Sequence, residues 1–217
     1  IIKKDNLLRT MIGLPQIDSD VYKMGTGGIS NPENKIINEL DIDIGSKINH
    51  FKKITNLEAM SYTDIYDYVD ENLNQILRIP AIHPVSMDKC KMSSGHGERM
   101  HPILKRMHMH DGHDFAPIEN FWNTEVYATA DGRVKKSIYL PDTYGHYIEV
   151  DHGNGIVTVY AHLRVRNVRK GQNVKRGQKI GIMGSTGMST SVHLHYEVKK
   201  NGRSIDPTHY YFDQTSL

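Results

Sequence analysis

The sequence has one cysteine, no long apolar run and almost no net charge. Cys90 stands alone among 217 residues, which excludes an intrachain disulfide and leaves the redox compartment open. No apolar run is long enough to span a bilayer, and a formal net charge of +2 is too small and scattered to predict nucleic-acid binding. A hydrophobic content of 38% and a charged content of 24% are typical of an ordinary globular protein.

The first part of the chain, residues 1–80, has the pattern of an extended and then helical region. The glycines of Gly25–Gly28 predict a flexible break. Asn31 is a suitable N-cap before Pro32, and a second helical segment is expected from about Thr55, interrupted at Ser61 or Thr63. Apolar residues recur every three or four positions, as in Ile37, Leu40, Ile44, Ile48 and Phe51. We therefore predict a helical hairpin or coiled-coil-like region.

The second part, residues 81–213, has the pattern of a mainly antiparallel β domain. Pro80 and Pro84 force an extended passage that ends the helix, and we place the domain boundary here. Asn201-Gly202 is a hairpin turn signal. Short β-type runs alternate with glycine turns at 125–130, 132–140, 147–151, 156–162, 179–183 and 192–199. The predicted fold class is thus α+β, an antiparallel β domain with an N-terminal helical segment.

Met107–Phe115 is dense in candidate metal ligands. His110 and Asp114 are four residues apart, and Gly112 between them and Pro117 after them disfavour a helix. On a strand, residues i, i+2 and i+4 share a face. We therefore expect the imidazole and the carboxylate to point the same way, with the glycine leaving room between them.

A second pair of histidines, His193 and His195, is two residues apart. On a strand both share one face, while Val192, Leu194 and Tyr196 occupy the other. Two imidazoles and a carboxylate, with a position left for water, are the ligands of a catalytic zinc ion. The competing interpretation is an irregular loop with surface histidines, and each short motif alone is weak. Their occurrence together favours the metal site.

Several separated motifs, taken in order, resemble the lysostaphin/LytM-type zinc endopeptidases, a family of peptidoglycan hydrolases. The resemblance covers about residues 93–210 and is specific because the motifs occur in the family's order. The motifs are Ser94-Gly95-His96-Gly97-Glu98-Arg99-Met100-His101-Pro102, His110-Asp111-Gly112-His113-Asp114-Phe115, Tyr160-Ala161-His162-Leu163, Gly184-Ser185-Thr186-Gly187, His193-Leu194-His195-Tyr196-Glu197 and Asp206-Pro207.

The resemblance implies a role for five side chains. His110, Asp114 and His195 would bind Zn²⁺, and His162 and His193 would be the catalytic histidines beside the water. A neutral histidine accepts a proton and a second one stabilises the oxyanion, in an order that the sequence leaves open. The additional histidines at 101, 108 and 113 are expected at the surface or in an outer shell.

The resemblance also implies the reaction, hydrolysis of peptide cross-links in bacterial peptidoglycan. We expect the D-alanyl–meso-diaminopimelate cross-link as the substrate. The alternatives are a glycyl-glycine endopeptidase, or a non-catalytic cell-wall-binding or amidase-activating module of the same fold. Ser191-Val192 stands where the family commonly has Gly-Pro, and Ala116–Thr124 lacks the family's usual glycine. Both departures concern the walls of the groove.

The setting of the protein is inferred from the same resemblance. The chain begins at Ile1, so we expect an export signal or membrane tether upstream and a location in the cell envelope, in the periplasm. The N-terminal helices are expected either to dock on the β domain and limit access to its groove, or to serve as a stalk or a homodimer contact.

Overall fold

The computed structural model describes residues 2–18, 20–21, 39–100, 105–119 and 123–212. The chain forms two compact units, one ending at Ile76 and the other beginning at Leu77. The predicted boundary between independently folding domains, at residues 80 and 81, stays a prediction. So does the idea that the N-terminal unit limits access to the groove.

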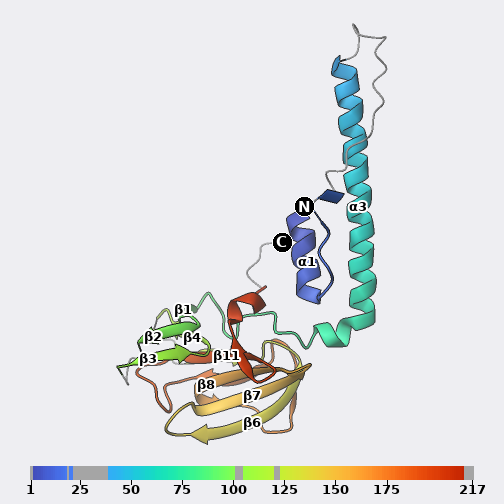
Figure 1. The fold of residues 1–217 in the computed structure, drawn as a ribbon. Coiled ribbons are helices and arrows are strands. Elements are labelled where there is room, and N and C mark those ends of the chain that lie inside the picture. Colours follow the sequence, from blue (N-terminus) through green and yellow to red (C-terminus); the bar gives the residue numbers. More distant parts are fainter. Residues whose placement is uncertain (1, 19, 22–38, 101–104, 120–122, 213–217) are drawn as a thin grey trace. The chain divides into compact units, whose positions relative to one another are not determined.

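In the described part of the N-terminal unit, helices α1 (Ile2–Ile12) and α3 (Glu39–Ile76) lie side by side (Figure 1). The predicted start of a second helical segment near Thr55, and its interruption at Ser61 or Thr63, were wrong, because α3 is continuous across these residues. Its hydroxyl side chains do not compete with the helix: Thr63 Oγ1 donates to the carbonyl of Ala59, one turn back. The expected start at Asn31 and Pro32 lies outside the described residues.

Helix α1 was not predicted, since its segment has mixed polarity and no clear apolar stripe. A buried polar group fastens it to α3. Ser61 of α3 donates a hydrogen bond to Asp5, and Arg9 donates to the same hydroxyl from Nη2 over 2.7 Å. All three side chains are buried. Among the described residues, no helix is long and apolar enough to cross a membrane.

The second unit is built from antiparallel strands (Figure 1). The sheet runs in the order β1-β4-β11-β8-β7-β6-β9, with β10 pairing β5 and β8, and β12 pairing β11; β2 and β3 pair separately. The strands are β1 (Cys90–Ser94), β2 (Gly97–Met100), β3 (Met107–His110), β4 (His113–Pro117), β5 (Glu125–Tyr127), β6 (Gly132–Leu140), β7 (Gly145–Gly153), β8 (Ile156–Arg166), β9 (Asn173–Val174), β10 (Lys179–Met183), β11 (Leu194–Lys200) and β12 (Arg203–Ile205), followed by the 3₁₀ helix η1 (Pro207–Tyr210).

This architecture confirms the predicted α+β class and the six predicted strands, with shifted ends. The hairpin at Asn201-Gly202 is also confirmed, because it joins β11 to β12. Strands β1 to β4 were not predicted as separate elements. Their sequences are short and rich in polar residues, so they give little of the alternation that identifies a strand.

The alternation of β11 places functional and core residues on opposite faces of the sheet. Leu194 and Tyr196 are fully buried in the main hydrophobic core, together with Phe115 of β4. His195 and Glu197, one residue out of phase, point to the other face. The core therefore fixes the orientation of the strand that carries the candidate ligands.

Gly112 has a packing role that differs from the predicted one. It follows the end of β3, and a Cβ here would overlap the carbonyl oxygen of Tyr196 and lie 2.8 Å from its carbonyl carbon. The glycine thus permits close approach of the β3–β4 connection to β11, and leaves no space for a ligand.

Alanine at position 112 is expected to destabilise the β unit by about 1–3 kcal/mol, because backbone atoms must move apart to admit the methyl group. The midpoint of urea unfolding of the purified protein measures this change. Gly95→Ala is the matched control, since no atom lies within 4 Å of a Cβ at that position. Equal midpoints for the two variants would contradict the packing role.

Candidate metal centre

Three strand ends bring His110, Asp114 and His195 together. His195 of β11 pairs directly with Asp114 of β4, and His110 is the last residue of β3. The prediction that His110 and Asp114 share one strand was wrong: the chain leaves β3 at Asp111-Gly112 and enters another sheet. The turn, and not the strand period, brings the two side chains to one place.

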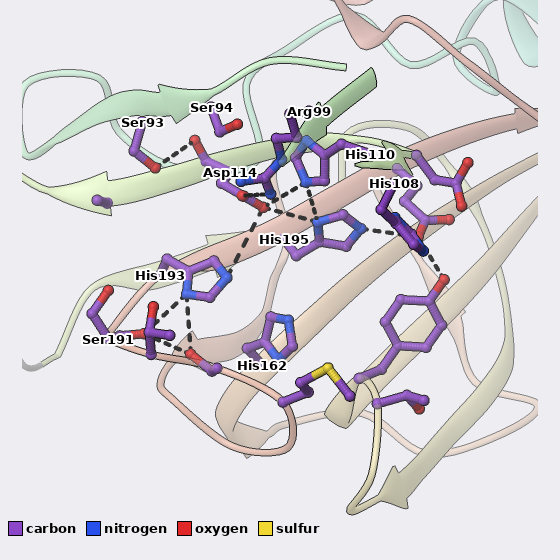
Figure 2. Close-up of a pocket in the computed structure, with 18 of the residues that line it drawn as sticks. Ser93, Ser94, Arg99, His108, His110, Asp114, His162, Ser191, His193 and His195 are labelled. Carbon is purple, nitrogen blue, oxygen red and sulfur yellow. Dashed lines mark hydrogen bonds and ion pairs between the residues drawn. The ribbon is translucent and has the colours of Figure 1, made fainter. Parts of the chain in front are cut away.

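The three side chains present one ligand atom each to a common point (Figure 2). His110 Nε2 lies 3.1 Å from Asp114 Oδ1 and 3.0 Å from His195 Nδ1, which is 2.8 Å from Asp114 Oδ1. Zinc bonds of about 2.0–2.2 Å in a tetrahedron separate ligand atoms by roughly 3.3–3.6 Å. A small outward movement thus gives the spacing for Zn²⁺, and all three residues are buried.

Neighbouring groups fix which atom of each side chain faces the common point. His110 Nδ1 donates to the carbonyl of Gly95 over 2.6 Å, and His195 Nε2 donates to Glu197 Oε1 over 2.9 Å. Arg99 Nη2 donates to Asp114 Oδ2 over 2.8 Å. Each imidazole therefore holds a proton on its outer nitrogen, so the inward nitrogen is the one that can offer a lone pair to a metal ion in place of a proton.

The electrostatics of the cluster favour a charged carboxylate. Burial opposes ionisation of Asp114, but hydrogen bonds from His110 and His195 outweigh it and hold the pKa of this carboxyl well below its usual range. Burial likewise opposes the charge on His195, while hydrogen bonds to Asp114 and Glu197 raise its pKa to about 9. The group thus attracts positive charge, which a metal ion or a proton provides.

His162 and His193 lie beside the three ligand candidates in the same pocket (Figure 2). Their ring centroids are 4.7 Å apart. His162 Nδ1 donates to the carbonyl of Thr186 over 2.8 Å, and His193 Nδ1 donates to that of Ser191 over 2.9 Å. Both Nε2 atoms remain as acceptors, and that of His193 is 4.0 Å from Asp114 Oδ1.

Both of these histidines are neutral at neutral pH. Burial is the main cause for each: it lowers the pKa of His162 to about 4, with a further contribution from His193, and it also lowers the pKa of His193. His162 has a φ of 59°, a left-handed conformation that is uncommon outside glycine. A strained backbone at a group that faces the pocket is typical of a functional position.

The pocket has a volume of about 670 Å³ and contains residues that the sequence did not single out. Glu197 is fully buried and accepts hydrogen bonds from His195 and from the hydroxyl of Tyr144, the latter over 2.6 Å. The period of two along His193, His195 and Glu197 is the signal by which Glu197 was predictable. Tyr144 gave no such signal.

The additional histidines at positions 101, 108 and 113 differ in where they lie. His113 is buried, not at the surface, and faces away from the ligand candidates; its Nε2 lies 3.1 Å from Asp206 Oδ1 and its Nδ1 3.1 Å from the hydroxyl of Tyr211. His108 is exposed at the edge of the pocket. His101 lies outside the described residues.

Residues 108–207 match the model of peptidase family M23. The chain contains an M23 domain. Peptidoglycan DD-endopeptidase ShyA of Vibrio cholerae is 41% identical over 141 residues, which cover 64% of this chain and 31% of that protein. DD-carboxypeptidase/endopeptidase Mpg of Neisseria meningitidis is 42% identical over 117 residues, 54% of this chain and 26% of that protein. The chain thus covers less than a third of either relative.

Among solved structures, the M23 domain is similar to one described as a zinc containing peptidase from Vibrio cholerae. The TM-score is 0.54 with 38% sequence identity, over 60% of this chain and 40% of that one. The LytM-type resemblance read from the sequence is therefore confirmed. The cluster of two histidines and one aspartate in the M23 domain fits Zn²⁺, the cofactor of this peptidase family.

Proposed function

We propose that this protein is a zinc-dependent endopeptidase that hydrolyses the D-alanyl–meso-diaminopimelate cross-links of bacterial peptidoglycan. One observation carries the proposal, the convergence of His110, Asp114 and His195 on a common point. The atom of each side chain that faces away from this point is held by a hydrogen bond, to Gly95, from Arg99 and to Glu197 respectively. The relatives named DD-endopeptidase and DD-carboxypeptidase/endopeptidase support the choice of bond. Their names also support a location in the cell envelope, which we place in the periplasm.

We assign His110 Nε2, Asp114 Oδ1 and His195 Nδ1 as the metal ligands. When bound there, Zn²⁺ supplies a Lewis acid that activates water and polarises the scissile carbonyl. Glu197 accepts the outer proton of His195, which leaves the inward nitrogen for the metal ion. The carboxylate is fully buried and also accepts a hydrogen bond from the hydroxyl of Tyr144, so its position is fixed.

We assign His162 and His193 to the proton transfers. Each donates its Nδ1 proton to a backbone carbonyl, so its Nε2 can accept a proton, and one of the two takes the proton that the attacking water gives up. The imidazole that has accepted the proton becomes a donor, either to the developing oxyanion or to the leaving nitrogen. A lowered pKa keeps both rings in the accepting form at neutral pH.

The test is digestion of purified dimeric muropeptides joined by the D-alanyl–meso-diaminopimelate bond. We expect monomers, detected by mass spectrometry, and a loss of turnover with a chelator that is restored by added Zn²⁺. Pentaglycine serves as the second substrate. Intact dimers beside efficient cleavage of pentaglycine would identify a glycyl-glycine endopeptidase, and cleavage of neither substrate would favour the non-catalytic cell-wall module.

A further inference from the structure

Arg99 is the one lysine or arginine among the described residues that line the pocket. It belongs to β2, in the two-stranded sheet beside the metal centre, and lies next to Asp114 (Figure 2). A guanidinium keeps its charge at every physiological pH. The pocket thus has a fixed cation of its own, in addition to any metal.

The contacts of Arg99 with the described residues use few of its donors. Its Nη2 donates to Asp114 Oδ2 over 2.8 Å, and this is its one ion pair with a described residue. A guanidinium has five N–H donors, so this bond uses a single one. The side chain retains 35% of its accessible surface, whereas that of Asp114 retains 10%. The guanidinium is therefore anchored on one side and open to the pocket on the other.

The anchoring carboxylate fixes the distance between Arg99 and the reacting centre. Asp114 presents Oδ1 to the two ligand histidines and Oδ2 to the guanidinium. The N–H groups of Arg99 are consequently separated from the ligand nitrogens only by the carboxylate of Asp114. A substrate group that reaches these N–H groups must be within a few bonds of the scissile amide.

The proposed cross-link carries such a group. Its scissile nitrogen is bonded to a carbon of diaminopimelate that also bears a carboxylate, whose carbon is about 2.5 Å from the nitrogen. We propose, on the basis of the proposed function, that Arg99 binds this carboxylate and thereby selects bonds whose leaving amine carries an adjacent negative charge. Arginine pairs with carboxylates through two parallel hydrogen bonds, which adds orientation to attraction. A glycine bridge has an uncharged amide at the same position.

The competing explanation is that Arg99 only orients Asp114. On this explanation, replacing Arg99 lowers kcat/KM equally for all substrates, because a misplaced Asp114 impairs every reaction at the metal. Recognition of the substrate predicts an additional loss of kcat/KM on substrates with the carboxylate. A pair of substrates that differ only in this group separates the two.

The experiment compares a dimeric muropeptide with the same dimer in which the carboxylate beside the scissile nitrogen is converted to a carboxamide. The protein is compared with Arg99→Gln, and with Arg203→Gln as a control at an exposed position on β12. Loss of the Asp114 contact should lower kcat/KM of Arg99→Gln by the same factor on both dimers. On the carboxylate dimer we expect a further loss of about 10- to 100-fold, typical of a charge-assisted hydrogen bond. Arg203→Gln should change little on either dimer.

Equal losses on the two dimers would overturn the proposal and leave Arg99 as a positioning residue. If the wild-type protein cleaves neither dimer, the proposed function fails, and calorimetric binding of the two corresponding monomers to the zinc-loaded protein still tests Arg99. Tighter binding of the carboxylate monomer that disappears in Arg99→Gln supports recognition. Equal affinity of the wild-type protein for both monomers overturns it.

Discussion

Replacing His195 by alanine should remove zinc from the protein and reduce hydrolysis to the uncatalysed background. Three protein ligands hold a catalytic zinc ion, and the two that remain, His110 and Asp114, leave the site too few donors. Elemental analysis of the purified variant should find the zinc content falling from about one per chain to near zero. Turnover of the cross-linked dimer should then be undetectable even when stoichiometric zinc is added.

A matched control is His209→Ala, which removes an exposed histidine on η1, outside the pocket. It should retain zinc and activity. Far-UV circular dichroism and the melting temperature of both variants separate the loss of a ligand from a loss of fold. A His195→Ala protein that keeps its full zinc content would contradict the ligand assignment.

Replacing His162 or His193 should abolish turnover while leaving the metal in place. Loss of one proton-transfer group typically costs about 10²–10⁴-fold in rate. Alanine is suitable at position 193. At position 162 the φ of 59° makes asparagine the safer choice, because asparagine tolerates the left-handed conformation better than most residues. The measurements are kcat on the dimer and zinc per chain.

The pattern across these variants distinguishes the two classes of histidine. We expect His195→Ala to lose both zinc and activity, and His193→Ala and His162→Asn to lose activity alone. Near-normal hydrolysis by both of the latter variants would contradict the proton-transfer assignment. Loss of zinc from either would move that residue into the ligand set.

The sequence was sufficient to predict the β domain and to name His110, Asp114 and His195 as a group, but not to predict how the chain brings these three residues together. The alternation in Val192–Tyr196 was sufficient, because the buried side chains of Leu194 and Tyr196 fix where His193 and His195 point. The four-residue interval from His110 to Asp114 was misleading. Spacing alone does not distinguish a strand from a turn between two short strands, and that distinction depends on pairing with β2 and β11.

Interactions between residues far apart in the chain could not be predicted from the sequence. Tyr144 reaches Glu197 across 53 positions, and Ser61 reaches Asp5 across 56. Neither residue type in its local context predicts such a partner. The same is true of Arg99, whose neighbour Asp114 is brought near by a separate hairpin.

The pairing of β4 with β11 has a consequence for how M23 domains of this kind can vary in length. His113, Asp114 and Phe115 pair with Tyr196, His195 and Leu194 in an unbroken register. A slip by one residue would turn every side chain of β4 to the opposite face, so that Asp114 would enter the apolar interior and Phe115 the pocket. An inserted or deleted residue within either strand is therefore incompatible with the metal site. Length changes that spare the chemistry are confined to the connecting loops, where they reshape the groove.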